Sequence, residues 1–348
     1  MTQNAKIITQ KDVANLAGVS RSVVSYVLND GPRSVAPETK KRILDAIEEL
    51  GYHPNKNAQR LKLGSTSAER CVGIIIGGRS FSFVEHAYYN SILSKLFEKV
   101  HQHEQEIRFF SCLEALTDPV YLNKNIHPEE ISSLILILPS MIDPSPEDKK
   151  IFTQIARRIG NVVCLGVPIK NWPTVTYDQS LAAQQAVEHL IDLGHQRIAH
   201  LGIPDDRLTG YHLALENHGL TYDESLVAFP DPGNIYNSSY QLIERFLQAA
   251  PMPTALFTAS DEIAFGAMAA LHDHGVAIPQ DMAITSIDDI ELASIVRPSL
   301  TTVNIPRLEM VSVAMQVLTD SQNGRKPKTE TIVLPTKLII RESCGANQ

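Results

Sequence analysis

Four side chains near the start of the chain can hydrogen-bond to nucleic acid, and their spacing brings them together. Arg21, Ser22, Ser25 and Tyr26 fall on one side of a helix predicted from Ser20 to about Asn29, because successive helical residues turn by about 100°. Each can donate to a base edge or to a phosphate. A solvated helix face is the alternative interpretation, but it does not account for the segments on either side.

The preceding residues predict a helix that holds this face in place. Thr9 and Asp12 have the spacing of a capping box for a helix that ends at Ala17. Gly18 then breaks the helix before Ser20 caps the next one. The apolar positions of the two helices are Val13, Leu16, Ala17, Val24, Val27 and Leu28. Two short helices joined by a turn that contains glycine predict a helix-turn-helix.

A third helix and a short fourth segment follow. Pro37 favours the first helical position, and Gly51 favours the end. The apolar face between them is Ile43, Leu44, Ile47 and Leu50. Residues 55–63 could form barely two turns, and so short a helix needs a partner in order to fold. This segment carries three cations suited to phosphates and one apolar side chain among them: Lys56, Arg60, Lys62 and Leu61.

These residues resemble the lactose-repressor and galactose-repressor (LacI/GalR) family of bacterial transcription regulators. The N-terminal resemblance rests on DVANLAGVS, VVSYVLN, ILDAIEELGYHPN and AQRLKLG. It implies a DNA-binding domain followed by a hinge helix, which pairs with that of a second subunit on DNA and inserts Leu61 into the minor groove. The DNA-binding residues that it implies are Thr9, Arg21, Ser22, Ser25, Tyr26, Asn29, Tyr52, Asn55, Lys56, Ala58, Arg60 and Leu61.

Two positions depart from the family pattern in the recognition helix. Tyr26 stands where many members carry Arg, and Val23 stands where Thr is usual. The operator sequence of a relative should therefore not be transferred to this chain.

The distribution of charge supports a nucleic-acid-binding segment. The whole chain has a formal net charge of −8, which is unusual for a DNA-binding protein. Residues 1–64, however, hold ten Lys and Arg against six Asp and Glu, a net charge of +4. The remaining residues carry 21 against 33, a net charge of −12. A basic module attached to an acidic body is the pattern expected of such a protein.

Composition also indicates the cellular location of the protein and whether a metal or cofactor is expected. No apolar run approaches the length needed to span a membrane, and the first residues MTQNAK lack an apolar signal region, so we expect a cytoplasmic protein. The scattered cysteines, Cys71, Cys112, Cys164 and Cys344, predict reduced and mostly buried thiols. A metal site could be assigned to the spaced histidines His189, His195 and His200. No Cys or carboxylate completes it, and turn or surface histidines are expected instead, with no metal and no cofactor.

From residue 71 onward, apolar strand-like runs alternate with helical ones, which predicts parallel sheets covered on both faces. The resemblance continues at VEHLIDLGHQRIAHLG, TASDEIAFGAMAALHDHGVAIPQDMAI, SIDDIELA, RPSLTTV and IIRES. It implies a core like the periplasmic binding proteins, with two α/β lobes. We expect a helix-turn-helix domain at 1–53, a hinge helix and linker at 54–70, and the effector-binding and dimerisation core at 71–345. The lobe crossovers are expected near 172, 300 and 328.

Ligands of open α/β sheets bind beyond the carboxyl ends of the strands. Arg207, Ser260, Asp261 and Asp288 are predicted at such ends. By family position, the resemblance implies that Arg207 and Asp288 are the main effector contacts, and it adds the pair Tyr88 and Tyr89. A carboxylate and a guanidinium suit a polyhydroxylated or anionic ligand. The alternative is that Arg207 and Asp288 form a structural ion pair or a helix cap. Tyr88 and Tyr89 could stack on a ring or belong to the core.

Three departures from the family pattern weaken the assignment of a specific sugar, and two of them, at Gly166 and Ser260, argue against a typical galactoside. Ser260 replaces the usual Asn, Gly166 stands where sugar-binding members have Asp, and Ser286 replaces a common Gly. Sugars, sugar phosphates and sugar acids all remain candidates. Asp261 and Asp289 are expected to be caps and groups that stabilise the lobe.

We therefore predict a sequence-specific transcription regulator, a repressor, whose affinity for a near-palindromic operator is controlled by a small sugar-like metabolite. The absence of the leucine-heptad tail of tetrameric relatives predicts a homodimer. A cytoplasmic small-molecule-binding protein without regulatory DNA binding is the alternative. An enzyme is not expected, because no nucleophile elbow, P-loop or GxGxxG follows a predicted strand.

Overall fold

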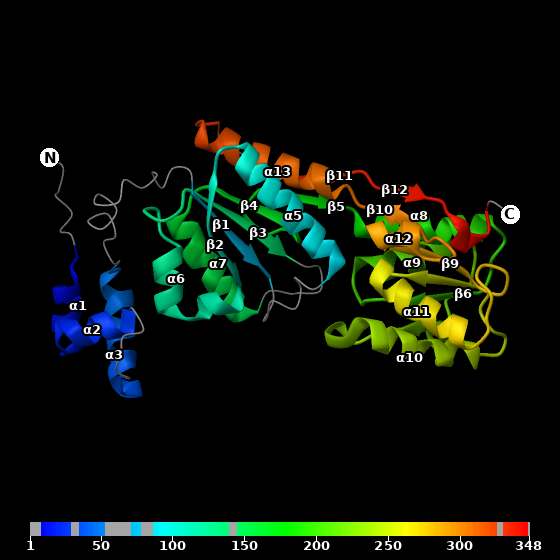
Figure 1. Cartoon of the computed structure of the whole chain (residues 1–348), viewed down its shortest axis with the longest axis horizontal. Coiled ribbons are helices and arrows are strands. Elements are labelled where there is room, and N and C mark those ends of the chain that lie inside the picture. Colours follow the sequence, from blue (N-terminus) through cyan, green and yellow to red (C-terminus); the bar gives the residue numbers. More distant parts are fainter. Residues whose placement is uncertain are drawn as a thin grey trace. The chain divides into compact units, whose positions relative to one another are not determined.

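The computed structural model of the chain describes residues 8–28, 35–52, 71–77, 86–138, 145–325 and 330–346 (Figure 1). They group into two compact units. The first comprises 1–80, 100–137 and 144–162, and the second comprises 81–99, 138–143 and 163–348. The predicted hinge and the DNA contacts assigned to Asn29, Asn55, Lys56, Ala58, Arg60 and Leu61 lie outside the described residues.

Three helices open the first unit: α1 (Gln10–Ala17), α2 (Arg21–Leu28) and α3 (Pro37–Leu50). The Asp12 carboxylate accepts hydrogen bonds from the Thr9 backbone N–H at 2.8 Å and from its hydroxyl at 2.6 Å, as the predicted capping box requires. Gly18 adopts a left-handed conformation with φ of 65°, which ends α1. The predicted helix-turn-helix elements are thereby confirmed.

A small core holds the three helices together. It contains Val13, Ala14, Ala17, Val24, Ile43, Ala46, Ile47 and Tyr52. The prediction that Leu16 faces this core is wrong, because its side chain is 47% exposed and Ala14 is buried instead. Ala14 and Ala17 are small, so α1 can pack closely against its neighbours. Tyr52, predicted to contact DNA, is only 4% exposed and packs within this core.

Two six-stranded sheets make up the remainder of the fold. The first sheet consists of β1 (Cys71–Ile76), β2 (Glu106–Cys112), β3 (Ser133–Leu138), β4 (Val162–Gly166), β5 (Thr174–Tyr177) and β11 (Thr331–Leu334). Its strand order is β11-β5-β4-β3-β1-β2, and β1 is parallel to both β2 and β3. Its strands alternate along the chain with α5 (Ala87–Gln102), α6 (Pro119–Asn125) and α7 (Pro146–Arg158).

The second sheet lies in the second unit. Its strands are β6 (Ile198–Leu201), β7 (Val227–Ala228), β8 (Ala255–Thr258), β9 (Ala283–Asp288), β10 (Thr301–Asn304) and β12 (Lys337–Ile339). The order is β12-β10-β9-β8-β6-β7, and only β12 runs antiparallel to its neighbour. The helices that accompany this sheet are α8 (Gln179–Asp192), α9 (Asp206–Asn217), α10 (Ile235–Leu247), α11 (Asp261–Asp273) and α12 (Glu291–Ile295). Helix α13 (Arg307–Gln322) instead contacts β5 of the first sheet.

The two sheets, parallel except for β12, confirm the predicted α/β core, but the sequence analysis missed several short elements. These are β5, α6 and α12, which have four, seven and five residues. All four cysteines are free and buried, as predicted. Among the described residues, no helix is long and apolar enough to cross a membrane, and no group of His, Cys, Asp and Glu could hold a metal ion.

His200 was predicted in a turn or at the surface, and that prediction is wrong. His200 is completely buried in β6, and its ring stacks on Tyr211 and on Phe257, each at a centroid distance of 5.1 Å. Burial, together with the nearby positive charge of Arg207, lowers the pKa of His200 from its ordinary 6.5 to about 3. The neutral imidazole is therefore part of the core of the second sheet.

We predict that His200 makes the second unit sensitive to acid. Between pH 6.5 and 3 the unfolded chain binds a proton at this position and the folded chain does not, so stability is lost as the pH falls. The free energy of unfolding should fall by about 1.4 kcal/mol per pH unit through this residue. Denaturant titrations at several pH values should show a weaker dependence in His200→Phe, but not in the exposed control His101→Phe. An equal slope in His200→Phe would contradict the prediction.

Candidate functional site

The four polar side chains of the predicted recognition face lie on α2. Arg21 and Ser22 are exposed, Ser25 and Tyr26 are half-buried, and Val24 on the opposite side is fully buried. Arg21 Nε donates to Gln10 Oε1 at 3.2 Å, which links the start of α2 to α1. The four polar side chains therefore share a helix whose apolar side is fixed in the core, as a helix that reads a DNA groove requires.

A second group of polar and aromatic side chains gathers within the second unit, at the carboxyl ends of parallel strands. Asp288 ends β9, and the pairing of Asp288 with Asn304 brings the end of β10 level with it. Arg307 begins α13, separated from the end of β10 by two residues, and Tyr177 ends β5. The charges of Arg207, Asp288 and Arg307 all act on Tyr177, so these groups share one environment.

The turn after β9 has an unusual backbone. Asp288 has a φ of 123° and Asp289 a φ of 53°, conformations that cost non-glycine residues on the order of 1–3 kcal/mol each. The Arg307 guanidinium donates to the carbonyl oxygen of Asp288 and, at 2.7 Å, to that of Asp289. The Asp289 carboxylate pairs with Arg341 at 2.6 Å. Asp289 is thus a structural group, as expected.

Arg307 was not among the predicted site residues, although the sequence contains a signal for it. A cation at the first position of a helix faces the positive end of the helix dipole, which disfavours it. Such a placement indicates a role outside the helix. Tyr177 was missed as well, because its short strand was not predicted.

Arg207 forms the structural ion pair that was considered as the alternative, but with Asp205 rather than with Asp288. Its Nη2 lies 2.6 Å from Asp205 Oδ2, and its Nη1 donates to the Ala259 carbonyl oxygen at 2.8 Å. Burial opposes the charge of the guanidinium, yet Asp205 more than offsets this and raises the pKa of Arg207. The positive charge of Arg207 is therefore already compensated by the Asp205 carboxylate.

Asp288 and Asp261 are buried carboxyl groups close to one another. Burial, and the charge of Asp261, raise the pKa of Asp288 well above its ordinary value. Asp261 accepts hydrogen bonds from the Thr302 hydroxyl at 2.6 Å and from the Ile290 N–H at 2.9 Å. Asp261 thus ties the start of α11 to β10 and to the turn before α12, which is the stabilising role expected of it.

Tyr88 and Tyr89 lie in the first turn of α5 and meet edge to face, with ring centroids 5.0 Å apart. The Arg307 Cζ lies 5.8 Å from the centre of the Tyr88 ring, within the range of a cation–π contact. Burial is the main cause of the raised pKa of both tyrosines, so their hydroxyls stay neutral donors. The structure brings this predicted pair into the environment of Arg207 and Asp288.

Two of the departures have structural explanations. Ser260 caps α11, its hydroxyl accepting from the Ile263 N–H at 3.4 Å. Gly166 has a φ of 102°, and a Cβ added to it would lie 2.2 Å from the Leu138 carbonyl oxygen. An Asp could not occupy position 166 in this backbone.

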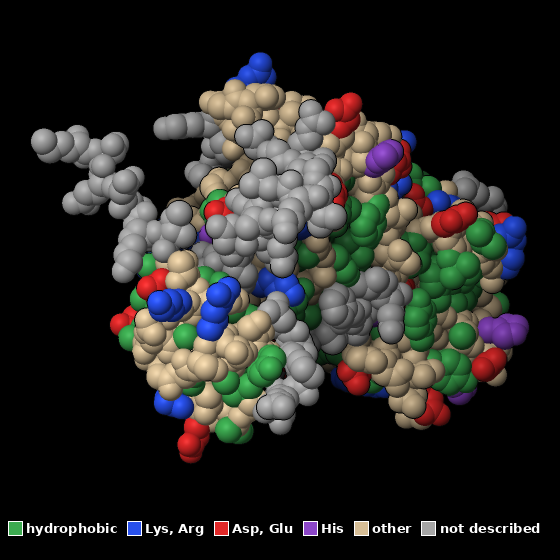
Figure 2. Space-filling model, turned by 60° about the vertical axis from the view of Figure 1, so that its left-hand side comes forward, with side chains coloured by type: hydrophobic (Ala, Val, Ile, Leu, Met, Phe, Trp, Pro, Cys, Tyr) green, Lys and Arg blue, Asp and Glu red, His purple; other side chains and the backbone are tan. Residues whose placement is uncertain are grey.

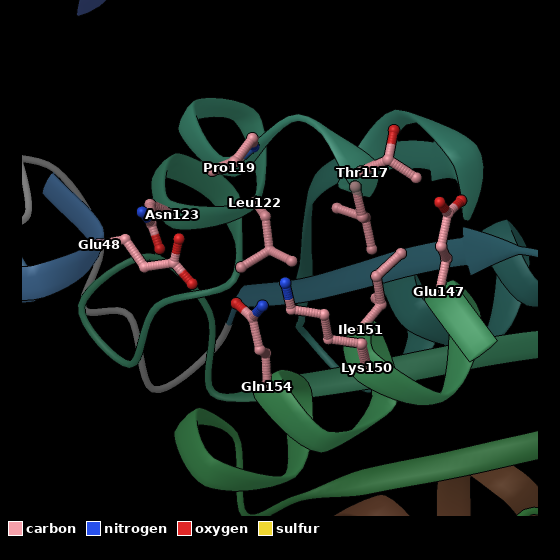
Figure 3. A pocket seen from close by; sticks show the side chains of 10 residues that line it. Glu48, Thr117, Pro119, Leu122, Asn123, Glu147, Lys150, Ile151 and Gln154 are labelled. Atoms are coloured by element: carbon pink, nitrogen blue, oxygen red, sulfur yellow. The ribbon is translucent and has the colours of Figure 1, made fainter. Parts of the chain in front are cut away.

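A separate pocket of about 330 Å³ lies in the first unit (Figure 3). Leu122 of α6 and Ile151 of α7 point into it. Its other lining residues are Glu48, Leu116, Thr117, Pro119, Asn123, Glu147, Lys150 and Gln154. None of the predicted site residues lines this pocket.

Family models match both the N-terminal part and the core of the chain. The family model "Bacterial regulatory proteins, lacI family" matches residues 9–55, and that of a periplasmic binding protein-like domain matches residues 187–344. The transcriptional regulator RegA of Clostridium saccharobutylicum is 32% identical to this chain, over 96% of the chain and 98% of the relative.

Solved structures are also similar to this chain over almost its whole length. The transcriptional regulator CelR in complex with cellobiose is 28% identical, with a TM-score of 0.67 and coverage of 97% of this chain and 99% of that one. The lac repressor dimer, bound to operator and the anti-inducer ONPF, is 26% identical with the same TM-score and coverage. The chain belongs to the lacI family of bacterial regulatory proteins and is a DNA-binding transcription regulator.

Proposed function

We propose that the protein is a dimeric repressor in the cytoplasm, and that a small uncharged polyhydroxylated metabolite, held near Asp288, controls its affinity for an operator. The observation that carries this proposal is the group formed by Asp288, Tyr88, Tyr89 and Tyr177 at the strand ends of the second unit. A carboxyl group accepts from ligand hydroxyls, and aromatic faces cover the apolar side of a sugar ring.

The charges around this group favour an uncharged ligand over a phosphate or an acid. Arg207 is neutralised by Asp205, and Arg341 by Asp289. Arg307 directs two of its donor groups to backbone carbonyls. An anionic ligand would therefore find Arg207 and Arg341 paired with carboxylates and both terminal nitrogens of Arg307 engaged, so that, of the Arg307 nitrogens, only Nε is left without a partner among the described residues. The relative CelR was solved with cellobiose, an uncharged sugar, which agrees with this reasoning.

Self-association is supported by exposed apolar side chains. Leu292 and Ile295 of α12 are 46% and 58% exposed, and Phe97 of α5 is 48% exposed. Hydrophobic side chains are also exposed on the face that Figure 2 draws. Covering apolar surface of this kind is a general driving force for oligomers. The lac repressor was likewise solved as a dimer on its operator.

The first prediction of this proposal concerns DNA reading. Arg21→Ala and Tyr26→Ala should each reduce discrimination between operator and random DNA by about 1–3 kcal/mol, because each removes a base contact. Gel-shift titrations with both duplexes at several salt concentrations measure this. Arg157→Ala, an exposed arginine of α7, is the matched control. Equal losses of affinity for operator and random DNA would mean that Arg21 and Tyr26 contact only phosphates.

The second prediction concerns the effector. Among sugars screened by thermal shift, uncharged mono- and disaccharides should stabilise the protein, whereas their phosphates and acids should not. Asp288→Asn should weaken binding of the stabilising sugar by about 0.5–1.5 kcal/mol, the range for a hydrogen bond between neutral groups, because its surroundings keep the Asp288 carboxyl group neutral. Unliganded operator binding should remain unchanged, because Asp288 lies outside the DNA-reading helices.

The control is Asp192→Asn, which alters an exposed carboxylate on α8. Arg207→Ala is a poorer test, because it removes the guanidinium partner of the buried Asp205 carboxylate, at a cost of about 3–5 kcal/mol in stability. Stabilisation by sugar phosphates alone would contradict the charge argument. Retention of full sugar affinity in Asp288→Asn would remove Asp288 from the site.

We propose further that the chain is not an enzyme and does more than capture a metabolite. A solute-binding protein would bind sugar but not operator, and an enzyme would turn the sugar over. A gel-shift with upstream genomic fragments, with and without the stabilising sugar, separates these alternatives. Loss of the shifted band on addition of that sugar is the expected result.

A further inference from the structure

One buried carboxylate in the second unit links three helices and was not singled out by the sequence. Glu262, the second residue of α11, is 5% exposed. Its Oε2 lies 2.8 Å from His86 Nδ1, and its Oε1 accepts from the Ala87 N–H at 2.9 Å. The hydroxyl of Tyr236, on α10, donates to the same Oε1 at 3.0 Å. Glu262 therefore has three partners, two of which are 175 or more residues away in the sequence.

The position of Ala87 explains what these contacts do. Ala87 is the first residue of α5, and the first N–H groups of a helix have no partner within it. Glu262 supplies an acceptor from another helix, so it acts as a cap for α5. It also lies in the first turn of its own helix, so that its negative charge meets the positive ends of two helix dipoles.

Glu262 remains a carboxylate despite its burial. Burial by itself would raise the pKa, but hydrogen bonds from His86 and Ala87 outweigh it, and the pKa of Glu262 is lowered. A buried carboxylate that loses these partners would be strongly destabilised, which makes the arrangement of the three helices specific.

The residues that follow Ala87 are Tyr88 and Tyr89, the aromatic pair of the proposed effector site. We propose that Glu262 is a positioning residue for that site: it fixes the first turn of α5 to α11 and so sets the place of both rings. The inference rests on the proposed effector function. Glu262 need not touch the ligand, because it acts through the backbone on which the two tyrosines are carried.

The first test requires no ligand. In hydrogen-exchange mass spectrometry, peptides covering residues 86–93 should exchange about tenfold faster in Glu262→Gln than in the wild type, because an amide is a weaker acceptor than a carboxylate. Tyr236→Phe, which removes one hydroxyl, should show a smaller increase, and it serves if Glu262→Gln does not fold. Unchanged exchange in both variants would overturn the proposal.

Two controls separate positioning from general loss of stability. Glu291→Gln alters an exposed glutamate in the first turn of α12. Ile243→Val lowers stability through the buried face of α10. Neither should change exchange in residues 86–93. An equal increase in Ile243→Val would mean that this turn reports only global stability, and the proposal would fail.

The second test uses cellobiose as the probe, measured by calorimetry. If wild type binds it, Glu262→Gln should raise the dissociation constant at least tenfold and leave operator affinity without sugar unchanged. An unaltered dissociation constant would overturn the positioning role. A wild type that binds neither cellobiose nor another uncharged sugar counts against the proposed function, whereas the exchange experiment still decides the role of Glu262.

Discussion

The contact on which the proposed effector site depends is the one between Arg307 and the backbone of Asp288 and Asp289. The positive φ values of these two residues are unfavourable without tertiary support. The guanidinium supplies it by donating to both carbonyl oxygens. The same side chain lies over the Tyr88 ring, so the turn that presents the carboxyl group and the aromatic pair share one support. A lysine could not replace it, because it lacks the planar fork of donors.

Charge compensation at this site follows a consistent pattern. Buried ionic groups are costly unless each has a partner. Arg207 has Asp205, Asp289 has Arg341, and Glu262 has three donors. Asp288 is the exception, since burial and Asp261 both oppose its charge. A ligand hydroxyl is the kind of partner that would relieve this, which ties the chemistry of the proposed effector to the electrostatics of the site.

Much of the fold was predictable because its elements carry strong local signals. The fully apolar strands β1 and β3, the cap formed by Thr9 and Asp12, and the glycine that ends α1 are readable from a few adjacent residues. Strand β5 and helix α12 are too short for a periodic pattern. Leu16 was misassigned because helical spacing alone does not tell which side of a narrow apolar stripe is covered.

The site was predictable only in part, for a related reason. Strand ends can be located from alternating strands and helices, and this identified Asp288 and the segment of Arg207. The partners of these residues depend on contacts between segments far apart in the sequence. Glu262 and His86 are separated by 176 residues, and no local pattern indicates that they meet. Sequence patterns therefore found the groups that could bind a ligand, but not those that hold them.

Gly166 has a consequence for how this regulator can evolve. Its backbone conformation and its closeness to the Leu138 carbonyl oxygen exclude every side chain. An aspartate at this position would have to displace the Leu138 carbonyl group before it could present its carboxylate. A single substitution therefore cannot add an acidic group at this strand end without a rearrangement of the main chain.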